Sequence, residues 1–554
     1  MAATLYAIPP TSFDFSKPAP VYLRTDSEAT LVDDQDHAGL VSGTKALSLK
    51  LQESEGKSFQ RVLGDSELSY YLPSRESGVN DMYLHLGFKA TPKLVERSRV
   101  AMVWAILRVR HPLLASRIEM HAYDDVRFVY DSPVSPGQAL SRAEDSLDYR
   151  TQTKDELLDS YLNGPRTLSD SRLSYLILSL PSEESAESIS TEVHLMICAT
   201  HFLGDGMALH AFANDFFTLL TSEKSVVELT SQLGEEWESR CSGVTDESAV
   251  IPGSMESKLP LQTASKLRQA AAKVDFQCSQ EQFIGGQSFP RRRAGPRKTI
   301  VPTVSFDEVK TKQMLKNCKA HGVSISAALF AICDIAWARL RKGSPELPTM
   351  MYSALNMRPY LAPSLPTLQD ESYWFLAVGY FNVILPTFLP ADERGTFWLR
   401  ARAAKEQSTK AAKHRFLVDR AREMSLLRGE RARRWGKEDD DKAAGIVAPP
   451  APAPSAAKPT PSRAPAPSTA LMGLSLLGNL DGTYKHANYA GMELHTLTTG
   501  SRQRAGGMLL FGYTFKGKLW VSLGYDENAF EEETVGAWWK GLLGGVEEFL
   551  ERDS

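Results

Sequence analysis

Thr200-His201-Phe202-Leu203-Gly204-Asp205-Gly206 is the stretch of sequence that decides the fold. Before it, apolar residues alternate through 193–199 in the way typical of a strand buried on both faces. After it, apolar residues recur every three or four positions from Leu209 to Leu220, which is the spacing of an amphipathic helix. His201 is therefore predicted to lie in a strand-to-helix loop with Asp205 at the helix N-cap. Such loops commonly carry the chemistry of α/β sheets.

The position of His201 suits a catalytic imidazole. The partial positive charge of a helix N-terminus disfavours imidazolium, so the side chain is expected to stay neutral near pH 7 and to accept a proton as a general base. Asp205 could cap the helix, pair with an arginine, or orient His201. Capping and ion pairing are favoured for Asp205 over a direct role in proton transfer. His201 and Asp205 are nevertheless the two catalytic candidates.

The composition excludes several function classes. The 554 residues carry a net charge of -4, which gives no reason to expect a nucleic-acid or membrane-surface partner. The five cysteines are odd in number and show no Cys-x-x-Cys spacing, so neither a disulfide framework nor a zinc site is predicted. Residues 372–391 lack charged side chains, but two prolines and an asparagine favour a buried extended segment over a transmembrane helix. We expect a cytoplasmic monomer.

The length predicts more than one domain. Weak periodicity separates two regions of alternating helices and strands, and a basic, then acidic, then Pro/Ala-rich stretch predicts a disordered insert. The predicted parts are an irregular lead-in at 1–60, a first lobe at 61–222, a crossover linker at 223–298, and a second lobe at 299–554 with the insert at about 428–468.

The second lobe has clear local signals. Apolar residues over 325–340 predict a buried helix, and those over 535–549 predict a closing amphipathic helix. Two apolar runs flanking Lys516-Gly517-Lys518 predict a β-hairpin.

These residues resemble the chloramphenicol-acetyltransferase-like superfamily, which includes BAHD acyltransferases, alcohol acetyltransferases and the condensation domains of nonribosomal peptide synthetases. The specific motif is His201-x-x-x-Asp205-Gly206. Four softer phrases follow in the order that the family requires: 107–117, with its Arg-His-Pro; 352–359, with Asn-x-Arg; 379–382; and 474–481.

The resemblance implies an α/β fold of two chloramphenicol-acetyltransferase-like lobes, with mixed sheets flanked by helices and a tunnel between them. His201 would take the proton from an acceptor hydroxyl, or less readily an amine, as it attacks a thioester. Asp205 would be turned away and paired with Arg358, and Gly206 would keep the tunnel floor clear. The predicted substrate-binding residues are Gly206, Asn356, Arg358, Ser475 and Asn479, with Ser475 and Asn479 as candidate oxyanion donors.

Three departures from the family bear on the donor. Thr200 replaces the first histidine of peptide-synthetase condensation domains, and the chain shows no carrier or adenylation module. The resemblance therefore implies an enzyme that uses no cofactor, takes acyl-CoA as co-substrate, and acylates an alcohol of a small molecule or lipid. The BAHD phrase Asp-Phe-Gly-Trp-Gly is also absent, which leaves the donor contacts open.

Other functions remain open at this point. The acyl thioester could be presented by a carrier protein, or the chain could be an inactive member that binds a ligand or partner. A metal cluster of His194, His201, Asp205 and His210 is disfavoured, because the first lies on the strand and the last lies one turn into the helix.

Overall fold

The computed structural model describes residues 57–181, 190–242, 250–261, 265–362, 372–446 and 467–552. Most of the predicted lead-in and the Pro/Ala-rich half of the predicted insert lie outside these residues. Residues 58–60, at the end of the predicted lead-in, belong to strand β1 (Ser58–Val62).

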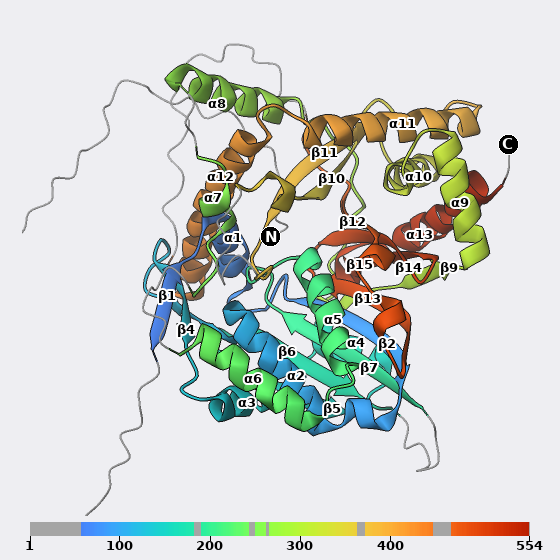
Figure 1. The fold of residues 1–554 in the computed structure, drawn as a ribbon. Helices are drawn as coiled ribbons and strands as arrows, with labels where there is room; N and C mark the ends of the chain where they lie inside the picture. The colour runs from blue at the N-terminus through green and yellow to red at the C-terminus, as the bar shows by residue number, and fades with distance from the viewer. Residues whose placement is uncertain are drawn as a thin grey trace, which may run out of the picture. The chain divides into compact units, whose positions relative to one another are not determined.

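The first lobe is built on a five-stranded sheet in the order β13-β2-β7-β6-β5. Its strands are β2 (Met82–Ala90), β5 (Leu147–Arg150), β6 (Ser174–Ser179), β7 (Thr191–Ala199) and β13 (Met492–Ser501). The strand predicted over 193–199 is confirmed as β7. Figure 1 shows β13, which comes from late in the chain, beside β2. The predicted lobe boundary therefore does not hold for β13, because no local signal tells a strand which sheet it joins.

Helices cover this sheet. They are α2 (Arg97–Arg110), α3 (Pro136–Glu144), α4 (Lys154–Asn163), α5 (Gly206–Leu220) and α6 (Val226–Arg240). Helix α2 ends before His111-Pro112, since proline disfavours a helical residue before it. Helix α6 lies inside the predicted linker, yet it buries Leu229 and Leu233 and pairs Glu236 with Arg110 of α2. This part of the linker belongs to the first lobe.

The second lobe is built on a seven-stranded mixed sheet in the order β11-β10-β12-β14-β15-β8, with β9 also paired to β15. The strands are β8 (Thr299–Ile300), β9 (Thr303–Phe306), β10 (Thr349–Asn356), β11 (Val378–Leu385), β12 (Met472–Asn479), β14 (Met508–Phe515) and β15 (Lys518–Asp526). The predicted hairpin is confirmed as β14 and β15, and Lys516 and Gly517 take the positive φ that its two-residue turn requires.

The helices of this lobe are α9 (Glu308–Ala320), α10 (Ile325–Leu340), α11 (Glu393–Ala412) and α13 (Glu532–Val546). The predicted helix at 325–340 is confirmed as α10, which is buried along most of its length. The predicted closing helix is confirmed as α13, followed by a π-helical turn, η8 (Glu547–Glu551).

Helix α12 (Leu417–Ala443) corrects the prediction of a disordered insert over 428–443. It packs along α1 (Asp65–Ser74) through small residues: a Cβ added at Gly429 would lie 2.1 Å from Asp65 Oδ1. Figure 1 shows the two helices side by side. The remaining faces of α12 carry mostly charged residues. The sequence of α12 therefore lacks the apolar periodicity by which a helix is predicted.

The remaining described elements are short or lie outside the two main sheets. They are β3 (Arg117–Met120), β4 (Val126–Asp131), α7 (Met255–Lys258), α8 (Lys266–Glu281), η1 (Pro92–Val95), η2 (Pro112–Ala115), η4 (Arg358–Tyr360), η5 (Leu480–Gly482), η6 (His486–Asn488) and η7 (Glu527–Ala529). Strands β1, β4 and β3 form a separate three-stranded sheet.

In the part of the chain that the structure describes, no single helix has both the length and the apolar content needed to span a membrane. The helices α9 and α10 meet that test only as a pair, and they are bent by 93° relative to each other.

Candidate active site

The loop between β7 and α5 has the predicted form. Strand β7 ends at Ala199 and α5 begins at Gly206, with Asp205 as its N-cap. Asp205 Oδ1 accepts hydrogen bonds from the backbone N–H groups of Met207 (3.0 Å) and Ala208 (3.3 Å). These bonds satisfy two N–H groups that have no partner within the helix. The predicted cap is confirmed.

Asp205 also forms the predicted ion pair with Arg358, which comes from η4 in the second lobe. Arg358 Nη1 lies 2.9 Å from both carboxylate oxygens, and the backbone N–H of Ala377 donates to Oδ2 at 3.0 Å. Arg358 Nη2 donates to the carbonyl groups of Tyr373 and Phe375. Because these donors occupy both carboxylate oxygens, Asp205 is positioned for a structural role.

The His201 side chain is fixed in one tautomer. Its Nδ1 lies 3.1 Å from the carbonyl oxygen of Gly204, and a carbonyl can only accept, so Nδ1 carries the proton. Nε2 is then the unprotonated nitrogen, and among the described residues no group is hydrogen-bonded to it. The ring of Tyr70 stacks on the imidazole at a centroid distance of 4.1 Å. This is the tautomer that a general base acting through Nε2 requires.

Burial lowers the pKa of His201 below its ordinary value of 6.5, and the Arg428 cation adds to the decrease. Asp205 and the hydrogen bond to Gly204 act in the opposite direction. The imidazole is therefore neutral at pH 7, as predicted. The main cause is desolvation, whereas the sequence argument named the helix N-terminus.

Three residues beside His201 were missed by the sequence analysis. The Tyr70 hydroxyl from α1 is hydrogen-bonded to the Tyr380 hydroxyl from β11. The guanidinium of Arg428, from α12, lies over both rings, 5.3 Å from the centroid of Tyr70 and 4.6 Å from that of Tyr380. These contacts are cation–π interactions. Burial raises the pKa of Tyr70 well above its ordinary value, so its hydroxyl stays protonated.

Ser475 shares a sheet face with Tyr380. Tyr380 pairs with Ala354, and Tyr352, two residues before Ala354, pairs with Gly473. Because side chains alternate along a strand, Tyr380, Tyr352 and Ser475 project from the same face. In the described part of the chain, the Ser475 hydroxyl has no hydrogen-bond partner. Ser475 therefore lies on the same sheet face as Tyr380, whose hydroxyl is bonded to Tyr70, the residue that stacks on His201.

The two predicted asparagines stabilise turns. Asn356 is exposed and its Oδ1 accepts the backbone N–H of Arg358 (3.1 Å). Asn479 is also exposed, and its Oδ1 accepts from the backbone of Asp481 (3.1 Å) and from the hydroxyl of Thr514 (3.3 Å). Asn356 thereby positions Arg358, and a role for either side chain in substrate binding stays a prediction.

The motif glycines differ in how closely they are packed. A Cβ at Gly204 would lie 2.8 Å from the ring of the fully buried Trp374, which is closer than real Cβ contacts allow. At Gly206 the nearest atom would be Leu477 Cδ2, the end of a flexible side chain, at 3.3 Å. Gly204 is therefore the more constrained position, although the sequence analysis selected Gly206.

The other two histidines of the disfavoured metal cluster point to different partners. His194 Nδ1 lies 3.2 Å from His85 Nε2, and His210 Nδ1 lies 2.8 Å from the hydroxyl of Tyr484. Neither side chain shares a partner with His201.

Comparison with known proteins rests on structure alone. No protein-family model and no curated protein sequence matches this chain. TRI3 trichothecene 15-O-acetyltransferase from Fusarium sporotrichioides is similar over 89% of this chain and 95% of its own, with a TM-score of 0.67 and 14% identity.

Two further solved structures are similar at lower TM-scores. Polyketide synthase associated protein 5 from Mycobacterium tuberculosis matches 88% of this chain and 100% of its own, with a TM-score of 0.52 and 14% identity. The condensation domain of the Monacolin K polyketide synthase MokA matches 88% and 97%, with a TM-score of 0.51 and 10% identity. These likenesses confirm the two-lobed chloramphenicol-acetyltransferase-like fold that the motif predicted.

Replacing Asp205 by Asn tests the ion pair. Loss of the carboxylate leaves Arg358, whose side chain is 21% exposed, without its counter-charge, so unfolding should become easier by about 3 kcal/mol. Thermal unfolding should show a lower Tm. Asp125→Asn, which breaks an exposed pair with Arg127, is the control and should leave the Tm near that of the wild type. An unchanged Tm in the Asp205 variant would contradict the structural role.

Alanine at the two motif glycines should have unequal effects. Gly204→Ala forces a methyl group against the rigid ring of Trp374, so it should destabilise the fold by about 1–3 kcal/mol, as overpacked core positions do. Gly206→Ala should cost less because Leu477 can change rotamer. Denaturant unfolding of both variants measures the difference in the free energy of unfolding. Equal decreases would show that the ring of Trp374 moves to accommodate the added methyl group.

Proposed function

We propose that this protein is an acyltransferase that moves an acyl group from acyl-CoA to a hydroxyl group of a small-molecule or lipid acceptor, with His201 as the general base. The observation that carries the proposal is the state of His201. Gly204 accepts from Nδ1, burial lowers the pKa of the imidazole, and Nε2 is left to receive a proton. The acetyltransferase-like fold supports the same class of reaction.

The proposed reaction begins with proton transfer to Nε2 from the acceptor hydroxyl, whose oxygen attacks the thioester carbonyl carbon. The carbonyl oxygen becomes an oxyanion in a tetrahedral intermediate. The C–S bond then breaks, and the CoA sulfur takes the proton from the imidazolium, leaving an ester and free thiol. A positioned base of this kind accelerates a reaction by about 10²–10⁴-fold.

The oxyanion needs hydrogen-bond donors, each able to contribute about 3 kcal/mol. We propose Ser475 for this role, because its hydroxyl has no hydrogen-bond partner among the described residues and shares a sheet face with Tyr380. Asn479 is the weaker candidate, since its side-chain oxygen is engaged in a turn and the residue is exposed.

The second candidate function differs in the donor. A carrier protein could present the acyl thioester, and the likeness to a condensation domain is the observation that favours it. Thr200 occupies the position of the first histidine in peptide-synthetase condensation motifs, which favours free CoA. Assays with acyl-CoA and with an acylated carrier protein separate the two.

Replacing His201 by Ala should slow the reaction strongly. With no base to take the acceptor proton, kcat should fall by about 10²–10⁴-fold. Release of free thiol from a series of acyl-CoA lengths, mixed with alcohol acceptors, measures the rate. His121→Ala, at a histidine whose side chain is 55% exposed, is the matched control and should keep wild-type activity. If His201→Ala releases thiol at the wild-type rate, His201 is not the general base and the proposed mechanism is wrong.

The pH profile should reflect the lowered pKa of His201. The neutral imidazole is the active form, so kcat/KM should rise with pH through a midpoint below 6.5 and stay level between pH 7 and 8. A midpoint above 6.5 would contradict the lowered pKa.

Arg428→Gln should move that midpoint to higher pH. The substitution removes a cation that disfavours imidazolium, so the pKa of His201 should increase. Arg428→Lys keeps a positive charge and should move the midpoint less. Arg434→Gln, on an exposed part of the same helix, controls for net charge and should have no effect. An unshifted midpoint in Arg428→Gln would show that the charge of Arg428 does not affect the pKa of His201.

A further inference from the structure

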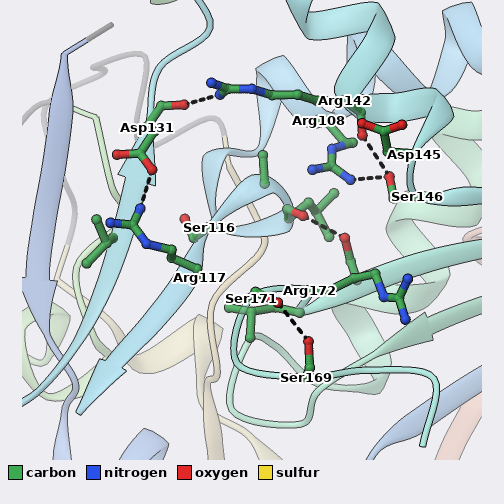
Figure 2. A pocket seen from close by; sticks show the side chains of 15 residues that line it. Arg108, Ser116, Arg117, Asp131, Arg142, Asp145, Ser146, Ser169, Ser171 and Arg172 are labelled. Carbon is green, nitrogen blue, oxygen red and sulfur yellow. Dashed lines mark hydrogen bonds and ion pairs between the residues drawn. The ribbon is translucent and has the colours of Figure 1, made fainter. Parts of the chain in front are cut away.

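A polar cavity in the first lobe is lined by residues of α2, α3, β3 and β4. Its volume is about 630 Å³, and none of its lining residues belongs to the candidate active site. Four arginines and two aspartates line it, which leaves two positive charges in excess. Figure 2 shows that the arginines lining the cavity belong to different parts of the fold. A concave, positively charged site of this size is suited to an anionic small molecule.

Among the described residues, neither aspartate forms an ion pair with Arg108 or Arg142. The carboxylate of Asp131 is paired with Arg117, which also contacts Glu119 (2.6 Å). Asp145 is exposed at the end of α3 and, among the described residues, forms no ion pair. Arg108 and Arg142 therefore face the cavity without a carboxylate within 4 Å in the described part of the chain.

The hydrogen bonds of these two arginines go to neutral groups. Arg108 donates from Nη1 to the hydroxyl of Ser146, and Arg142 donates from Nη1 to the backbone carbonyl of Asp131 at 2.5 Å (Figure 2). Burial lowers the pKa of Arg108 to about 10; the nearby Arg142 cation adds to the decrease, and Tyr130 and Asp145 act in the opposite direction. Two cations that repel each other and keep unused N–H donors are stabilised by an anion placed between them.

The rest of the lining matches an anion attached to an organic body. The hydroxyls of Ser169 and Ser171 are hydrogen-bonded to each other at 3.0 Å, so one of their two protons is free to donate outward. Leu114, Val129 and Leu173 add apolar surface. The volume far exceeds that of an inorganic anion, which leaves room for an organic body beside this apolar surface.

We propose that this cavity binds an organic phosphate, with the phosphate oxygens accepting from Arg108 and Arg142 and the organic body lying toward the Ser169–Ser171 hydroxyl pair. Phosphate fits better than a single carboxylate, because it offers three or more acceptor oxygens and up to two negative charges to two guanidinium groups. The phosphates of CoA and those of a free nucleotide or sugar share this chemistry. The proposal does not rest on the acyltransferase reaction.

Calorimetric titration of the full chain with ADP, CoA and glucose 6-phosphate tests the site. At least one should bind with a Kd below about 1 mM, and adenosine, which lacks phosphate, should not bind. Arg108→Met and Arg142→Gln should each weaken that binding about tenfold, because each removes a charge-assisted hydrogen-bond donor. Arg434→Gln is the control of equal charge change and should leave the Kd unchanged.

The choice of probes distinguishes the phosphates of CoA from those of a free nucleotide or sugar. Binding of CoA but not ADP, weakened by both variants, assigns the cavity to the phosphates of CoA, and ADP or glucose 6-phosphate binding assigns it to a free organic phosphate. If inorganic phosphate binds with the same affinity as the organic probes, the cavity does not recognise an organic body, and that claim is overturned. Absence of binding by every probe, or a Kd unchanged in both variants while they retain the wild-type Tm, would overturn it entirely.

Discussion

The ion pair between Asp205 and Arg358 is the interaction on which the candidate site depends. Its carboxylate caps α5 in the first lobe, and its guanidinium connects to the backbone at Tyr373 and Phe375 in the second. Gly204, whose carbonyl sets the tautomer of His201, directly precedes Asp205. One pair of charges therefore joins the lobes and positions the imidazole. A buried pair of this kind is costly to break, since removal of either partner leaves an isolated charge.

His201 receives opposing influences from the two sides of the site. Asp205 favours imidazolium, whereas burial and Arg428 disfavour it, and the net effect is a lowered pKa. The Arg428 cation is itself surrounded by the rings of Tyr70 and Tyr380, which stabilise it without a carboxylate. A carboxylate in that place would raise the pKa of the imidazole. The aromatic contacts thus allow a positive charge near His201 that adds to the effect of burial on the pKa of the imidazole.

The sequence predicted the parts of this site that are local or belong to the motif. His201 and Asp205 follow from the strand-to-helix pattern, and Arg358 follows from the family resemblance. Arg428 could not be found in the same way, because α12 buries small residues instead of large apolar ones. The buried set is Ala421, Ser425, Gly429, Ala432 and Gly436. Their spacing of three and four is helical, but without apolar side chains it resembles a solvated segment. Pairings such as β13 with β2 depend on contacts distant in sequence and leave no local pattern.

The connections between the lobes bear on how the site works. Besides the ion pair, β13 carries the chain from the second lobe into the first, and α12 packs on α1. Arg502, at the end of β13, donates to the carbonyls of Tyr161 and Gly164 in the first lobe. Separating the lobes would break all of these contacts together. The groups around His201 are therefore held in place by contacts from both lobes, and groups fixed in this way act on a charge without the free-energy cost of reorientation.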